Sequence, residues 1–140
     1  MSTYEFLEHP TDLKIRAFGE SLDEVFTNMA KGMFAAITDE ELIIRDETVI
    51  QDFEMNSVDL PSLLVDYLNQ LISLGDTNNE IYDYFELGIM QIGNENWSLK
   101  CRATGYKVSG LKLEIKAVTY NELKIAEQVG QWLAEVVFDI

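Results

Sequence analysis

The spacing of apolar residues along the chain predicts two amphipathic helices. After Ser21, apolar side chains recur at alternating steps of three and one, which is the period of a helix with one buried face. Ser21 also begins a capping box, so we predict a helix over Leu22–Ile37. A second apolar stripe follows Asp59 and predicts a helix over 60–74, with Gly75 as its natural end.

Alternation of apolar and polar positions predicts eight extended segments, which make seven or so strands. They are expected at 4–9, 12–18, 49–55, 85–92, 97–104, 113–120, 123–127 and 131–140. The segments 38–47 and 75–80 are polar and are expected to be irregular. The last segment, 131–140, is apolar on both faces and is therefore expected inside a sheet, covered on both sides. We predict one α+β domain over 1–140, with two helices packed on one side of a mostly antiparallel sheet.

Composition adds a strong negative charge to this picture. The chain of 140 residues carries 25 acidic and 10 basic residues, for a formal net charge of −15. Such a field repels nucleic acid and anionic membranes, and it favours metal ions or a basic protein partner. A simpler explanation of the acidity is solubility. We expect no direct binding of nucleic acid and no association with a membrane.

The single cysteine and the amino-terminal sequence bear on the compartment. With Cys101 alone, the chain cannot form an intrachain disulfide, which fits a reducing environment. The first residues contain no basic region followed by an apolar run, and no stretch is long and apolar enough to span a bilayer. We therefore expect a soluble cytoplasmic protein.

Few residues in the chain are suited to catalysis. There is no Gly-rich phosphate loop, no paired-cysteine zinc spacing and no nucleophile elbow. His9 is the only histidine and precedes a proline in an expected turn, which favours a structural role. Cys101 falls on the apolar face of its strand, so we expect a buried small hydrophobic residue rather than a nucleophile.

Oxygen ligands remain as the candidate chemistry. Glu8, Asp12, Asp139 and the carboxylate of Ile140 are hard donors that suit calcium, magnesium or manganese. Asp12 begins one expected strand and Asp139 ends another. If these strands pair antiparallel, the two aspartates meet at one edge of the sheet. On spacing alone, scattered surface acids remain the alternative.

Four stretches of the sequence together resemble the archease family. Each is a weak motif alone, but they occur in the family's order and extend from one end of the chain to the other. They are Phe6-Leu7-Glu8-His9-Pro10-Thr11-Asp12 with Gly19-Glu20-Ser21-Leu22, Leu63-Leu64-Val65-Asp66-Tyr67-Leu68-Asn69, Ile115-Lys116-Ala117-Val118-Thr119-Tyr120, and Trp132 through Phe138-Asp139-Ile140.

The resemblance implies an accessory protein that is not itself an enzyme. Archeases assist the RtcB-type RNA ligase of tRNA splicing and RNA repair by promoting its GTP-dependent guanylylation and its turnover. The family binds a divalent ion, commonly calcium, and the matching ligand positions here are Asp12, Asp139 and Ile140. Neighbouring residues that could touch the ligands or the partner are Glu8, His9, Lys116 and Thr119.

Some positions remain open on this resemblance. Family members often have histidine where this chain has Asn121, so no role can be given to a histidine there. Asp66 and Asn69 lie off the apolar stripe of the second helix, and either a structural role or a partner contact fits them.

Two other functions compete with a ligase activator. The first is an acidic, chaperone-like binding module without any role specific to a ligase. The second is a small metal-dependent hydrolase that uses His9, Glu8 and the carboxylates. It requires a pocket beside the metal with an open coordination position.

Overall fold

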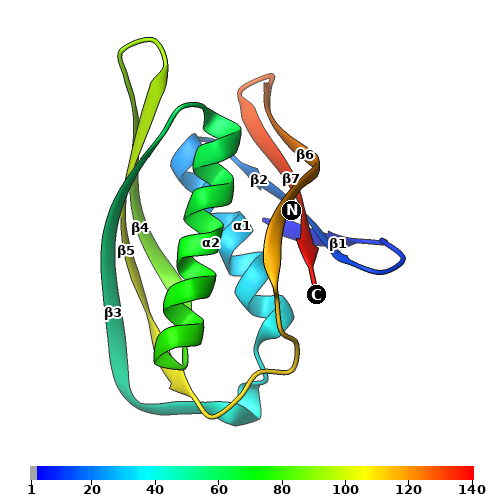
Figure 1. The fold of residues 1–140 in the computed structure, drawn as a ribbon, viewed down its shortest axis with the longest axis vertical. Coiled ribbons are helices and arrows are strands. Elements are labelled where there is room, and N and C mark those ends of the chain that lie inside the picture. Colours follow the sequence, from blue (N-terminus) through cyan, green and yellow to red (C-terminus); the bar gives the residue numbers. More distant parts are fainter. Residues whose placement is uncertain (1–2) are drawn as a thin grey trace.

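The computed structural model describes residues 3–140 and places two helices between two β-sheets (Figure 1). The helices are α1 (Leu22–Ile37) and α2 (Leu60–Asn78), with a short 3-10 helix η1 (Glu40–Leu42). The strands are β1 (Tyr4–Leu7), β2 (Leu13–Gly19), β3 (Ile43–Ser57), β4 (Glu80–Ile92), β5 (Asn96–Val108), β6 (Ala117–Gln128) and β7 (Gln131–Asp139). No helix in the described part of the chain is long and apolar enough to cross a membrane.

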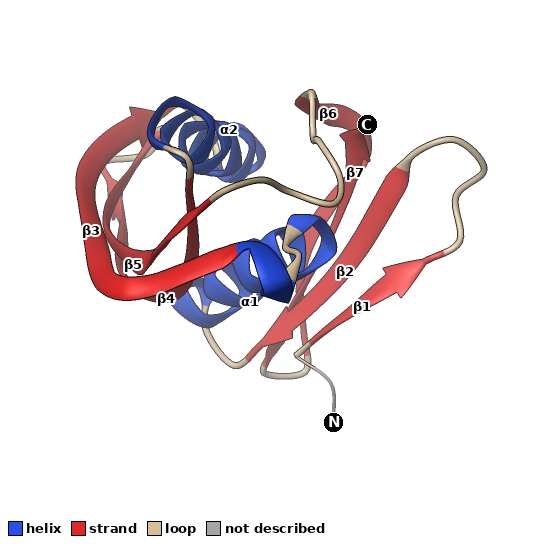
Figure 2. Ribbon diagram, turned by 90° about the horizontal axis from the view of Figure 1, so that it is seen from below, coloured by secondary structure: helices blue, strands red, loops and turns tan. Residues whose placement is uncertain are grey.

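The strands divide into sheet A, in the order β1-β2-β7-β6, and sheet B, in the order β3-β5-β4. All pairings are antiparallel, and β7 is an inner strand as predicted. The α+β class is therefore confirmed, but the single sheet of the prediction is two sheets. Both helices contact both sheets, with α1 against β2 and β4 and α2 against β6 and β3 (Figure 2). The apolar stripe of each helix is wide enough to contact sheet A on one side and sheet B on the other.

The helical stripes form the core between the sheets. Met29 and Met33 are fully buried, as expected for residues that fill the core. From α2, Tyr67 is fully buried, and its ring packs beside Phe26 of α1 with 5.5 Å between the ring centroids. Helix α1 has the predicted bounds because Ser21 accepts a hydrogen bond from the backbone N–H of Glu24, as its capping box requires.

Helix α2 is longer than predicted because Gly75 does not end it. The helix runs to Asn78, and Asn79 closes it in the left-handed conformation with φ of 56°. A Cβ atom at position 75 would lie 2.8 Å from the carbonyl oxygen of Glu80. Glycine is therefore required there by the close approach of β4, and the expected loop over 75–80 was wrong.

Several strand boundaries also differ from the prediction: β1 is shorter than expected, and β3, β4 and β5 are longer. The segment 38–47 is irregular only in part, because η1 is followed by β3 from Ile43. The segment predicted at 113–120 begins too early, because residues 113–116 precede β6. Its remainder and the segment predicted at 123–127 lie on that one strand, whose pairing with β7 shifts between Thr119 and Lys124. A bulge of this kind interrupts the alternation of apolar and polar residues, so the sequence pattern predicts two strands where there is one.

A buried carboxylate joins the three strands of sheet B. Glu80 is 4% exposed, and its carboxylate accepts hydrogen bonds from Tyr82 Oη at 2.7 Å and Gln51 Nε2 at 2.9 Å. Lys107 Nζ lies 3.1 Å from the same group. Burial raises the pKa of Glu80, but the hydrogen bonds and the Lys107 charge outweigh burial, so its pKa is below the ordinary value.

This lowered pKa predicts a pH-dependent contribution to stability. In the unfolded chain a glutamate titrates at about pH 4.3, above the folded pKa of Glu80. Its stabilising effect is therefore fully present above that pH and is lost as the pH falls through the folded pKa. We expect Glu80→Gln to be less stable than the native chain at pH 7, with a difference that narrows by pH 3. Urea unfolding at several pH values measures this, and a difference that stays constant would contradict it.

Candidate functional site

The pairing of β2 with β7 brings the two predicted aspartates together along the backbone. The last pair of the register is Leu13 opposite Phe138, and Asp12 and Asp139 are the residues that follow this pair on the two strands. The carboxyl end of β7 lies beside the turn that leads into β2 (Figure 2). The antiparallel pairing of these two strands, which the sequence argument required, is therefore present.

Strand β6 and the residue before it hold the same end of β7 from its other side. The backbone N–H of Lys116 donates to the carbonyl oxygen of Asp139 at 2.7 Å, and Thr119 Oγ1 donates to the carbonyl oxygen of Val137 at 3.0 Å. Lys116 is exposed, so its side chain remains available to a partner. These two residues therefore fix the position of the strand end that carries Asp139.

Charged side chains form a continuous row across sheet A, which we call the charged row. In order of contact its members are Glu5, Arg16, Glu135, Lys14, Glu122, His9 and Asp12. Neighbouring members are 2.7 to 3.8 Å apart. Acids alternate with bases along it, and the hydrogen bond to Glu135 raises the pKa of Arg16. Alternation compensates each charge within the row by its neighbours.

At the Asp12 end of the charged row, the negative charges are not fully balanced by neighbouring positive charges. His9 Nδ1 lies 3.4 Å from Asp12 Oδ2, yet this nitrogen is buried without a hydrogen-bond partner. Within residues 3–140, no lysine, arginine or histidine lies at ion-pair distance from Asp139. Among the described residues, Asp12 thus has only the His9 ring as a possible cation and Asp139 has none, an arrangement that can attract a metal ion.

The side chains present do not by themselves make a complete metal site. In the part of the chain that the structure describes, no group of three or more His, Cys, Asp or Glu side chains is arranged to hold a metal ion. The candidate set has only two carboxylate side chains, and its third member, Ile140, would contribute main-chain oxygen. Glu8 is exposed and its side chain makes no hydrogen bond or ion pair within residues 3–140, so it is not brought to the other candidates.

Glu122 belongs to this cluster although the sequence pattern did not indicate it. Its carboxylate contacts both His9 and Lys14, and their hydrogen bonds lower the pKa of Glu122. Its backbone is left-handed, with φ of 57°, inside the irregular part of β6. The period of apolar residues in a sequence does not predict a left-handed residue. The only indication in the sequence was a polar Asn-Glu pair between two apolar stretches.

The polar residues of α2 have structural partners. Asp66 Oδ2 accepts a hydrogen bond from Ser57 Oγ at 2.7 Å, which joins α2 to the end of β3. Asn69 Oδ1 accepts one from the backbone N–H of Val118 at 3.3 Å, which joins α2 to β6. Both side chains therefore position strands around the helix.

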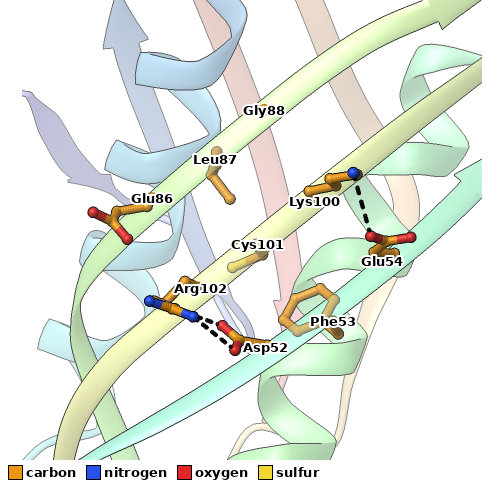
Figure 3. Close-up of a pocket in the computed structure, with 9 residues that line it drawn as sticks. All are labelled: Asp52, Phe53, Glu54, Glu86, Leu87, Gly88, Lys100, Cys101 and Arg102. Carbon is orange, nitrogen blue, oxygen red and sulfur yellow. Dashed lines mark hydrogen bonds and ion pairs between the residues drawn. The ribbon is translucent and has the colours of Figure 1, made fainter.

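A separate concavity of about 640 Å³ lies on sheet B and is lined only by β3, β4 and β5 (Figure 3). Its charged groups are largely paired with one another, since Arg102 binds Asp52 at 2.8 and 3.1 Å and Lys100 lies 3.5 Å from Glu54. Burial raises the pKa of the Cys101 thiol to about 12, which keeps it protonated at neutral pH. A protonated thiol is a poor nucleophile, and the concavity does not include His9 or Asp12.

Comparison with known proteins identifies the family. The sequence profile of the Archease protein family matches residues 4–140. The chain is 38% identical over 141 residues to protein archease of Methanosarcina mazei, covering 98% of this chain and 95% of that protein. It is 32% identical over 145 residues to protein archease of Pyrococcus abyssi, with 100% of both covered.

Solved structures agree with this result. The fold is similar to the solution structure of Methanobacterium thermoautotrophicum protein 1598, with a TM-score of 0.79, 30% identity and 100% of both chains covered. It also resembles the crystal structure of a Thermotoga maritima archease, described as a possible chaperone, with a TM-score of 0.62 and 24% identity over 96% and 94% of the chains. The second likeness concerns the fold alone. Because the family profile and full-length relatives agree with the motifs that flank the candidate site, this chain belongs to the archease family.

Proposed function

We propose that this protein activates an RtcB-type RNA ligase by promoting its GTP-dependent guanylylation, and that it does so with a bound divalent ion. The observation that carries the proposal is the antiparallel pairing of β2 with β7, whose last pair, Leu13 and Phe138, is followed by Asp12 and Asp139. Membership of the archease family supports it, because the resemblance implies this role. The protein acts as an accessory to the ligase and is not itself an enzyme.

The proposed ligands are Asp12, Asp139 and Ile140, and calcium is the proposed ion. Carboxylate oxygens are hard donors that suit calcium, and magnesium or manganese use the same donors. Where Ile140 is the final residue, its α-carboxylate supplies further oxygen beside Asp139. A bound cation would neutralise the uncompensated end of the charged row and present a positive centre to oxygen atoms of the partner.

The net charge supports a protein partner rather than RNA. A chain with a formal net charge of −15 is repelled by RNA phosphates and attracted by a basic protein surface. We therefore propose that the protein docks on the ligase and leaves RNA binding to it.

A guanylylation assay tests the proposal. Ligase and labelled GTP are incubated with and without this protein, in calcium and in EDTA. We expect faster formation of the ligase–GMP adduct in the presence of the protein and calcium, and loss of that stimulation in EDTA. The ligase alone under both conditions is the control for its own metal requirement. An equal rate with and without the protein in calcium would contradict the proposal.

A chaperone-like role is the competing function, since a relative of the same fold is described as a possible chaperone. It predicts that the protein suppresses aggregation of unrelated clients to the same extent in calcium and in EDTA. That result, together with no stimulation of the ligase, would replace the activator proposal.

A further inference from the structure

We infer that Glu122 is a positioning residue for the proposed metal site, holding His9 and thereby the turn that carries Asp12. This inference rests on the metal site of the proposed function and adds to it a residue outside the ligand set. Glu122 reaches the site from β6, whereas His9 and Asp12 belong to the turn between β1 and β2.

Glu122 uses its two carboxylate oxygens on two different neighbours of Asp12. Oε2 lies 2.9 Å from His9 Nε2, and Oε1 lies 3.3 Å from Lys14 Nζ. His9 is three residues before Asp12 and Lys14 is two residues after it. One side chain therefore connects the two sides of the turn, and it does so from a strand that is distant in sequence.

The contact to His9 fixes the direction of the imidazole ring. With Nε2 held by Glu122, Nδ1 faces Asp12 Oδ2 at 3.4 Å. The His9 side chain is only 18% exposed, so the ring has little freedom to turn away. The ring thus limits the positions that the Asp12 carboxylate can adopt, while Asp12 Oδ1 has no hydrogen bond or ion pair within residues 3–140.

The backbone of Glu122 supports a specific role for this residue. A non-glycine residue with φ of 57° is in a conformation that the chain avoids unless surrounding contacts determine it. In β6 this residue lies within the shift of pairing between Thr119 and Lys124. Departing from regular pairing lets the Glu122 side chain reach across to the turn.

Two explanations of Glu122 can be separated by substitution. A positioning role needs an acceptor of the same length at His9, whereas an electrostatic role needs only a negative charge near the cation. Glu122→Gln keeps the acceptor and removes the charge. Glu122→Asp keeps the charge and shortens the reach, and Glu122→Ala removes both. Glu127→Gln is the matched control, because Glu127 is an exposed acid on the same strand.

Calcium titration of these variants by calorimetry is the test. Groups that orient metal ligands commonly contribute about 10-fold to metal affinity, so we expect Glu122→Ala and Glu122→Asp to bind calcium roughly 10-fold more weakly. Glu122→Gln and Glu127→Gln are expected to stay close to the native affinity. Loss in Glu122→Gln equal to that in Glu122→Ala would show an electrostatic role and overturn the inference, as would native affinity in Glu122→Ala.

A spectroscopic measurement without metal provides a second readout. His9 is the only histidine, so its ring nitrogens give one unambiguous set of NMR signals. We expect Glu122→Ala to change the signals of both ring nitrogens and Glu122→Gln to preserve them, with unfolding free energies that differ little. Native calcium affinity in Glu122→Ala overturns only this inference, whereas no calcium binding by the native chain overturns the proposed metal site as well.

Discussion

Asp12→Ala is expected to abolish the stimulation of ligase guanylylation and to leave the fold intact. The substitution removes one of the two carboxylate side chains in the proposed metal site, so too few oxygen donors remain to hold calcium. The Asp12 side chain is 25% exposed and precedes β2, so its loss opens no cavity in the core. We expect the free energy of unfolding to change by no more than about 0.5 kcal/mol.

Adduct formation at saturating GTP measures this effect, with thermal unfolding of the variant as the check on its fold. Glu8→Ala is the matched control, because Glu8 is an exposed acid of the same turn region with no side-chain contact within residues 3–140. It should stimulate the ligase as the native chain does. Normal stimulation by Asp12→Ala would remove Asp12 from the proposed site.

Gly105→Ala is expected to produce the largest loss of stability. Gly105 lies on β5, the inner strand of sheet B, opposite Val49 on one side and Tyr82 on the other. A Cβ atom there would overlap the carbonyl oxygen of Ile81 and lie 2.7 Å from the Cα atom of Tyr82. These atoms belong to the backbone and cannot move aside without breaking the strand pairing. We expect a loss of about 3 kcal/mol in the free energy of unfolding.

Gly88→Ala is the control for this substitution, since it makes the same chemical change on the neighbouring strand. A Cβ atom at position 88 would have no neighbour within 4 Å. We expect the free energy of unfolding to change by no more than about 0.5 kcal/mol. This range includes a small stabilisation, because alanine restricts the unfolded chain more than glycine does. Urea denaturation of both variants at neutral pH measures the difference. Similar stabilities for the two would show that β4 and β5 do not approach as closely as described.

Helices and strands could be predicted from the sequence where a local pattern is typical of only one kind of structure. The bounds of α1 follow from its capping box and its apolar period, and the hairpin of β4 and β5 follows from the polar turn around Gly93. The position of β7 inside a sheet follows from its two apolar faces. Each of these depends on neighbours in the sequence.

The remaining features depend on contacts between distant residues. Gly75 was interpreted as a helix end because glycine often has that role, but here it makes room for the backbone of Glu80. The division into two sheets depends on which strands pair, which alternation along one strand does not specify. Of the candidate site, the pairing of β2 with β7 beside Asp12 and Asp139 could be predicted, but the bridge from Glu122 could not.

The pairing of β2 with β7 also determines when the site can form during protein synthesis. Sheet B consists of three strands that follow one another in the chain, whereas β2 must wait for β7, which is made after every other element. Domains generally begin to fold from the amino-terminal side as the ribosome releases them, and contacts between distant residues form slowly. Sheet B can thus assemble while β1 and β2 still lack their partner. A nascent chain interrupted before β7 would keep all strands of sheet B and lack Asp139, one of the two aspartates of the proposed site.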